Sequence, residues 1–271
     1  MHGEIYAITT KGRSVDNIAS RFYIASLKGL EDILMCQYPL LCADALWHAG
    51  SHQIRTCSSI KKINTRLVSY SREVADAASR KVYVAADITT SGKMMEPAGD
   101  MTYEAAFEMY REQIEILKNA GVDLIVAETM INIEETLAAV DAASTVCQLP
   151  IMCTMTVDAD GSIFSGGNAI EAAVSLEAAG ADAVGVNCSV GPDQLISVIR
   201  NIRENVSIPV IAKPNAGMPF IDDQGNAVYS MKAPDFAKHI KALIDAGAGI
   251  VGGCCGTTPE YIKEVATILE R

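Results

Sequence analysis

Short apolar runs alternate with longer amphipathic segments from about residue 80 to the end of the chain. The apolar runs predict six strands, and the segments that follow them have the spacing of helices. The predicted strands are 82–86, 123–129, 150–157, 182–188, 209–213 and 248–251. The predicted helices are 103–119, 133–146, 169–179, 192–205, 234–246 and 261–269. Continuous apolar strands are typical of a parallel sheet that is buried on both faces, so the pattern predicts an α/β fold.

Several predicted helices carry capping residues at their ends. Thr102 is placed to cap the helix that follows it, and Gly121 stops the same helix. Asn132 and Glu135 resemble a capping box with asparagine in the place of serine or threonine. The Ala-Gly pairs that end a helix directly before the next strand are 120–121, 179–180 and 246–247. These joints support a repeated strand–helix unit.

The first 80 residues have a weaker pattern. The elements that they predict are a strand over 4–10, a helix over 14–35 capped by Ser14, a strand over 39–43 and a helix from Ser58 or Ser59 to about 78. His48, His52 and Cys57 lack the spacing of metal ligands and are interpreted as loop residues. Two weak units and six clear ones give the eight of a (β/α)8 TIM barrel. A doubly wound open sheet is the alternative, but no GxGxxG motif follows an early strand.

Composition and charge restrict the class of protein. The 271 residues are 49% hydrophobic and 20% charged, which is typical of a globular protein and sufficient for one barrel. The net charge of −11 argues against a nucleic acid or an anionic membrane as a partner. No apolar run reaches the roughly 20 residues of a membrane helix, and no signal peptide opens the chain. Eight cysteines without an export signal favour a reducing cytoplasm and a metal-binding or catalytic use of the thiols.

Two adjacent cysteines, Cys254 and Cys255, lie among glycines at the end of the last predicted strand. Neighbouring side chains of a strand point to opposite faces, so both can serve one centre only where the backbone turns. The flanking glycines permit such a turn. The pair is therefore either half of a metal site or two small buried thiols, and alone it does not decide between them.

A third cysteine favours a metal site. Cys188 also ends an apolar run, just before Gly191-Pro192. Three thiolates at the same ends of parallel strands are suited to bind one Zn²⁺ and to leave a fourth position open, which is the pattern of catalytic zinc. Glu128 and Asn215 fall at strand ends too, and the barrel predicts that all five residues converge. The simpler interpretations are a hydrogen-bonded strand-end carboxylate for Glu128 and a turn residue for Asn215.

Three motifs resemble those of the homocysteine S-methyltransferases. They are Gly185-Val186-Asn187-Cys188-Ser189, Lys213-Pro214-Asn215-Ala216-Gly217 and Gly252-Gly253-Cys254-Cys255-Gly256-Thr257-Thr258-Pro259. The resemblance extends from about Asn64 to the C-terminus and implies a TIM barrel. It further implies that Cys188, Cys254 and Cys255 bind zinc as the catalytic centre. By the same resemblance Asn215 fills the fourth position before substrate arrives, and Glu128 holds the amino group of homocysteine.

The chemistry of the cysteines agrees with that assignment. A free thiol is mostly protonated at neutral pH, and coordination to zinc deprotonates it. Three thiolates leave the centre with a net charge of about −1, which suits a soft thiolate better than water. The expected reaction is the attack of zinc-bound homocysteine, or a related thiol, on a methyl group to give methionine. The sequence leaves the donor open between a separate corrinoid protein and a small molecule.

The beginning of the chain departs from the family. The strand candidate 4–10 lacks the family's Asp-Gly, the region 46–52 lacks a Thr-Asn motif, and 87–92 replaces a Gly-Pro-Thr-Gly-like turn. We therefore predict a single domain, 1–271, in which 1–60 is divergent, 64–271 is family-like, and the first two strand–helix units are atypical or incomplete. Two alternatives remain: a zinc-binding barrel with a degraded pocket and a non-catalytic or assembly role, and a barrel of unrelated chemistry with metal-free cysteines.

Overall fold

The structure is a computed structural model that describes residues 8–9, 57–77, 82–225 and 227–269. Its main sheet has the strand order β1-β9-β6-β5-β4-β3-β2. The strands of this sheet are β1 (Ile8–Thr9), β2 (Ala85–Ile88), β3 (Leu124–Met130), β4 (Ile151–Met155), β5 (Ala183–Cys188), β6 (Val210–Pro214) and β9 (Ala248–Val251). All pairs from β2 to β9 are parallel. From β2 to β9, each strand of this sheet lies beside the one that precedes it in the chain, as successive strand–helix units require.

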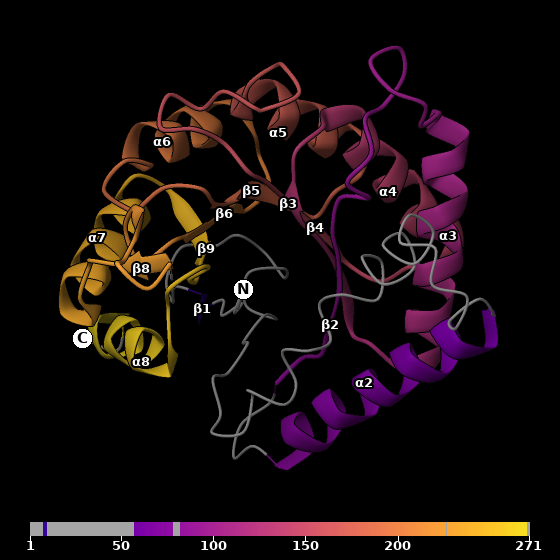
Figure 1. Ribbon diagram of the computed structural model, residues 1–271, viewed down its shortest axis with the longest axis horizontal. Coiled ribbons are helices and arrows are strands. Elements are labelled where there is room, and N and C mark those ends of the chain that lie inside the picture. The colour runs from indigo at the N-terminus through magenta and orange to yellow at the C-terminus, as the bar shows by residue number, and fades with distance from the viewer. Residues whose placement is uncertain (1–7, 10–56, 78–81, 226, 270–271) are drawn as a thin grey trace.

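Helices cover the outside of the curved sheet (Figure 1). They are α2 (Cys57–Ala77), α3 (Tyr103–Ala120), α4 (Ile133–Val146), α5 (Ala169–Ala178), α6 (Ile196–Asn205), α7 (Ala233–Asp245) and α8 (Pro259–Leu269). The six strongly patterned strands and helices of the sequence are therefore all present. Among the described residues, no helix is both long enough and apolar enough to cross a membrane.

The start of the chain is atypical where it is described. Ile8 and Thr9 form the short strand β1, which pairs antiparallel with β9 through Ile8–Val251 and Thr9–Ile250. A regular barrel would have a parallel strand in that place. The predicted helix over 14–35 and the predicted strand over 39–43 lie outside the described residues, as do His48 and His52.

Local capping follows the sequence with one exception. The Thr102 side chain accepts a hydrogen bond from the Ala105 N–H, and Gly121 ends α3 in the left-handed conformation with φ 96°. Asn132 caps α4 by accepting from the Glu135 N–H. The Glu135 side chain does not reach back to Asn132. Its carboxylate instead accepts hydrogen bonds from Thr90, Ser91 and Tyr110, so it fixes the loop after β2.

The buried side chains divide into two layers that follow the alternation of each strand. A small cluster inside the sheet's curve consists of Leu124, Val126, Met152, Ala183, Ile211 and Ile250. The residues between them, such as Ile125 and Val184, join the larger cluster that packs the sheet against the helices. Positions 128, 154, 187 and 213 continue the inward series on β3, β4, β5 and β6. They carry Glu128, Thr154, Asn187 and Lys213, so a buried polar layer follows the apolar interior.

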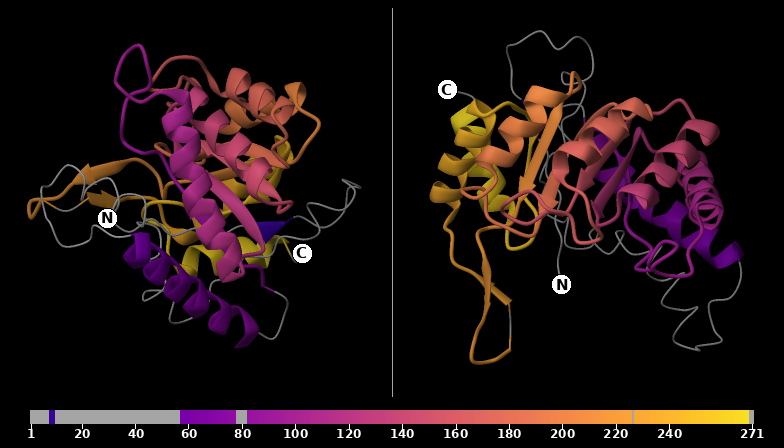
Figure 2. Two further views of the ribbon diagram at one scale, coloured as in Figure 1. Left: turned by 90° about the vertical axis from the view of Figure 1, so that its right-hand side faces the viewer. Right: turned by 90° about the horizontal axis from the view of Figure 1, so that it is seen from above.

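A hairpin that the sequence pattern did not predict follows β6. Its strands β7 (Pro219–Ile221) and β8 (Ala227–Tyr229) pair antiparallel, and Figure 2 shows the hairpin projecting from the rest of the fold. The turn uses Gly225 at φ 83°, where a left-handed backbone favours glycine. Its outer side chains Phe220 and Ile221 are exposed, whereas Tyr229 returns toward the end of β9.

Gly185 on β5 should not tolerate a side chain. A Cβ at this position would overlap the backbone oxygen of Ile211 on β6. We expect Gly185→Ala to lower the free energy of unfolding by about 1–3 kcal/mol, the usual cost of overpacking, as measured by urea denaturation. The matched control is Gly249→Ala on β9, where the new Cβ would meet Pro209 at an ordinary 3.7 Å. Equal losses in both variants would show that the close approach of the two strands is not the cause.

Candidate metal centre

The first cysteine of the site is held at the end of β5 by an unusual backbone. Cys188 and the following Ser189 have φ angles of 64° and 57°. Thr129 near the end of β3 has φ 57°, and these three are the non-glycine residues with positive φ in the described part of the chain. Non-glycine residues in this conformation need support from their surroundings and tend to gather at functional sites. Here all three lie at the carboxyl ends of inner strands.

The two adjacent cysteines lie in a turn that follows the last strand of the sheet. β9 ends at Val251, and the turn after it is closed by the Thr257 side chain, which donates to the Cys254 carbonyl at 2.6 Å. Gly256 completes the turn at φ 81°. The Cys254 N–H also donates to the Pro214 carbonyl at 2.8 Å, which fastens the turn to the end of β6. The backbone turn predicted from the glycines is therefore present.

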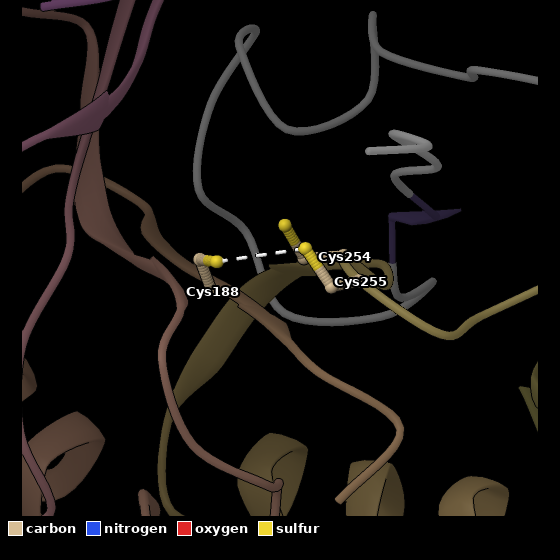
Figure 3. A group of neighbouring side chains, drawn as sticks. All are labelled: Cys188, Cys254 and Cys255. Carbon is tan, nitrogen blue, oxygen red and sulfur yellow. Dashed lines mark hydrogen bonds between the residues drawn. The ribbon is translucent and has the colours of Figure 1, made fainter. Parts of the chain in front are cut away.

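These turns bring the three sulfurs together, although Cys188 is 66 and 67 positions from the pair in sequence. The sulfurs of Cys188, Cys254 and Cys255 all lie within 4.8 Å of one another, and Figure 3 shows them grouped at one place. The Cys188 and Cys255 sulfurs are 3.7 Å apart. In a tetrahedral site with Zn–S bonds of about 2.3 Å, two sulfurs lie about 3.8 Å apart. The donor set therefore fits zinc in both kind and spacing.

The thiols influence one another's ionisation strongly. Hydrogen bonds with Cys188 and then Cys254 lower the pKa of Cys255 to about 3, and the Tyr229 hydroxyl acts in the same direction. Hydrogen bonds with Cys188 and Cys255, followed by burial, raise the pKa of Cys254 well above that of a free thiol. The Cys254 hydrogen bond lowers the pKa of Cys188, but the Cys255 bond and burial outweigh it. The cluster thus favours one thiolate, and a cation is needed to ionise all three.

Glu128 lies beside this cluster and is paired with a lysine. The Lys213 ammonium donates to Oε2 of Glu128, and the two residues are only 1% and 4% exposed. Burial raises the pKa of the Glu128 carboxyl, the nearby Lys213 charge lowers it, and the Cys255 charge raises it further. The simpler interpretation of Glu128, a satisfied strand-end carboxylate, correctly describes its ion pair. Its predicted contact with a substrate amino group stays a prediction.

Asn215 lies directly after β6 and is also buried. Its side-chain Oδ1 accepts the Cys255 N–H at 3.1 Å, and its own N–H donates to the Val190 carbonyl. The Ala216 N–H in turn donates to the Cys255 carbonyl at 2.9 Å. Asn215 therefore joins the loops that carry Cys188 and Cys255, as a turn residue with a structural role. Its predicted role as a fourth zinc ligand stays a prediction.

Three further residues of the site were not singled out from the sequence. Lys213 pairs with Glu128, and Asn187 donates from Nδ2 to the Cys254 sulfur at 3.7 Å. Tyr229 hydrogen-bonds to the Cys255 sulfur, and a Cβ on Gly256 would overlap its ring, so the hairpin packs directly against the cysteine turn. Lys213 and Asn187 were inside the quoted motifs, and the period-two alternation of β5 and β6 was the signal that they point inward.

A comparison with known families shows which family this chain belongs to. The family model described as homocysteine S-methyltransferase matches residues 44–269. The chain belongs to the homocysteine S-methyltransferase family. The match begins before Asn64, where the motifs placed the start of the resemblance.

Methionine synthases are among the relatives of this family member. The enzyme of Mycobacterium leprae is 29% identical over 235 residues, which are 83% of this chain and 19% of that protein. The enzyme of Mycobacterium tuberculosis is 30% identical over 216 residues, which are 76% of this chain and 18% of that protein. The chain thus spans less than a fifth of the length of these two relatives.

Solved structures of the family have the same fold. The homocysteine methyltransferase MmuM from Escherichia coli matches in its apo form with a TM-score of 0.66 and 20% identity, over 88% of this chain and 86% of that chain. Its metallated form matches with a TM-score of 0.66 and 18% identity, over 89% and 86%. The predicted α/β barrel class is confirmed, with the atypical antiparallel β1 at its start.

Proposed function

We propose that this chain is a zinc-dependent methyltransferase that activates homocysteine, or a related thiol, for methyl transfer, which gives methionine from homocysteine. The observation that carries the proposal is the grouping of the Cys188, Cys254 and Cys255 sulfurs within 4.8 Å of one another in a member of this family. When bound, zinc would hold the incoming thiol as a thiolate at neutral pH. The three cysteines are its proposed ligands and form the catalytic centre.

The surrounding residues support binding of an amino acid thiol. Glu128 is buried so close to the thiols that the Cys255 charge raises the pKa of its carboxyl. The Lys213 ammonium donates to the Oε2 atom of Glu128 alone. We assign Glu128 to the substrate amino group. The Asn215 side chain accepts a hydrogen bond from the Cys255 N–H, so it lies next to the proposed metal ligands. We assign Asn215 to the fourth metal position before substrate binds. The turn at Cys254 and Cys255 is held by hydrogen bonds to the end of β6 and by the Thr257 side chain within the turn, so the sulfurs are fixed before the ligand arrives.

The methyl donor remains open between a separate corrinoid protein and a small molecule. The mycobacterial relatives are methionine synthases more than five times the length of the matched region, since that region is 19% or 18% of each. We include a methylated corrinoid protein among the candidate donors because these relatives are methionine synthases. The Escherichia coli relative is described as a homocysteine methyltransferase, and 86% of its apo-form chain is covered. We keep a small-molecule donor as the second candidate.

The test combines metal analysis with methyl transfer by the zinc-loaded protein. We expect about one zinc per chain and methionine formation from homocysteine with one donor of a panel that includes methylated corrinoid protein, sulfonium and betaine compounds. Zinc without homocysteine binding or turnover would favour the alternative of a degraded pocket. Zinc far below one equivalent would contradict both and favour metal-free cysteines in a barrel of other chemistry.

A further inference from the structure

Asn187 forms a bridge between two parts of the proposed site. It lies directly before Cys188 on β5, points into the barrel and is 1% exposed. Its Oδ1 accepts the Thr129 N–H at 2.9 Å, and its Nδ2 donates to the Thr129 hydroxyl at 2.8 Å. The same Nδ2 donates to the Cys254 sulfur at 3.7 Å. One amide thus contacts β3 on one side and the cysteine turn on the other.

The chemistry of the partners fixes which way this amide faces. A backbone N–H can only donate, so the atom that faces the Thr129 N–H must be the carbonyl oxygen. The NH2 group is then left to face the Thr129 hydroxyl and the sulfur of Cys254. A thiolate accepts but does not donate, so an N–H is the group that suits it. The orientation therefore does not depend on an arbitrary assignment of the oxygen and nitrogen atoms.

The contact on β3 holds a strained part of the backbone. Thr129 has φ 57°, and the register between β3 and β4 shifts between Ala127 and Met130. The peptide whose N–H is bound by Asn187 is the one that joins Glu128 to Thr129. A left-handed threonine persists only where neighbouring groups hold it, and Asn187 supplies two hydrogen bonds to it. Asn187 therefore constrains the backbone that carries the Glu128 carboxylate.

We propose that Asn187 is a positioning residue. It holds the sulfur of the proposed ligand Cys254 and the backbone of Glu128 in a fixed position relative to each other. On the sulfur side, its N–H draws electron density from the Cys254 thiolate and orients it. On the β3 side, its hydrogen bonds to Thr129 fix the position of the Glu128 backbone, from which the carboxylate extends. The spacing between the bound thiol and the substrate amino group is then set by one side chain. This inference rests on the proposed function, in which Cys254 binds the metal and Glu128 binds the amino group.

The test uses Co²⁺ in place of zinc, because cobalt reports its sulfur ligands by their charge-transfer absorption. Asn187→Ala should shift this absorption to lower energy, since a thiolate without its N–H donor is a better electron donor. Its metal affinity should fall by about 10–100-fold, the usual effect of losing a partner of a ligand. Homocysteine affinity of the cobalt protein should fall by about tenfold or more, because the Glu128 backbone is released. The nearly isosteric Asn187→Asp should shift the absorption in the same direction if Asn187→Ala does not fold.

Thr154→Val is the matched control. Thr154 is fully buried at the equivalent inward position of β4, and its hydroxyl has no hydrogen-bond partner among the described residues. We expect wild-type absorption and homocysteine affinity for this variant. An Asn187→Ala protein that changes in neither readout, or in only one, would overturn the coupling, and so would an Asn187→Asp protein with wild-type absorption. A wild-type protein without a cobalt–thiolate band would overturn both this inference and the proposed function. Because neither readout needs a methyl donor, absence of turnover alone would overturn only the proposed function.

Discussion

Replacing any one of Cys188, Cys254 or Cys255 with alanine should abolish stoichiometric zinc binding and methyl transfer. Each substitution removes one of the three proposed zinc ligands, whose sulfurs lie within 4.8 Å of one another. Loss of an outer partner of a zinc ligand costs about 10–100-fold in metal affinity, and loss of the ligand itself should cost more. The measurement is zinc content after dialysis against a weak chelator, with methionine formation assayed on the same samples. Far-ultraviolet circular dichroism would show that each variant is folded.

Cys153→Ala is the control for these substitutions. Cys153 is fully buried on β4, in the layer between sheet and helices, and burial raises the pKa of its thiol to about 12. It should therefore be inert, and its variant should keep wild-type zinc and turnover. A Cys255→Ala protein that retained one zinc at wild-type affinity and full activity would contradict the mechanism proposed for this chain.

Lys213→Met should be strongly destabilising. It leaves the buried Glu128 carboxylate without its ammonium partner, and breaking a buried ion pair costs about 3–5 kcal/mol. The free energy of unfolding, measured in urea at pH 8, should fall by an amount of this order. The double variant Glu128→Gln/Lys213→Met should lose less than the sum of the two single variants, because no unpaired charge remains. The control is Lys241→Met, which breaks an exposed pair with Asp245 and should cost about 0–1 kcal/mol.

The loss of unfolding free energy in Lys213→Met should increase as the pH rises. Burial already raises the pKa of Glu128, and removal of the Lys213 charge raises it further. The folded variant then retains a proton that the unfolded chain releases above about pH 4.3, so its stability falls as pH rises through that interval. The difference from wild type should accordingly be smaller at pH 5 than at pH 8. A difference that is equal at both values would show that lost packing, rather than the unpaired carboxylate, causes the effect.

The fold was predictable wherever apolar runs and caps were clear. Thr102 and Gly121 cap the two ends of α3 as predicted, whereas α6 begins at Ile196 rather than near Pro192. The residues after Pro192 form a turn instead, with the Leu195 N–H donating to the Pro192 carbonyl. The hairpin β7–β8 was missed because strands of three residues, with a proline at the start of one, give almost no periodic signal.

The sequence by itself determined the repeated strand–helix units and the three cysteines of the candidate centre. These signals are local: continuous apolar runs, glycines around a Cys-Cys pair, and a third cysteine at another strand end. Only the tertiary structure decided that Lys213 reaches Glu128, 85 positions away, and that Asn187 joins Thr129 to Cys254. Those contacts depend on the curvature and register of the sheet, which bring inward positions of non-adjacent strands together. Neither quantity is encoded in the residues near each partner, so each pairing becomes visible only after the whole sheet has formed.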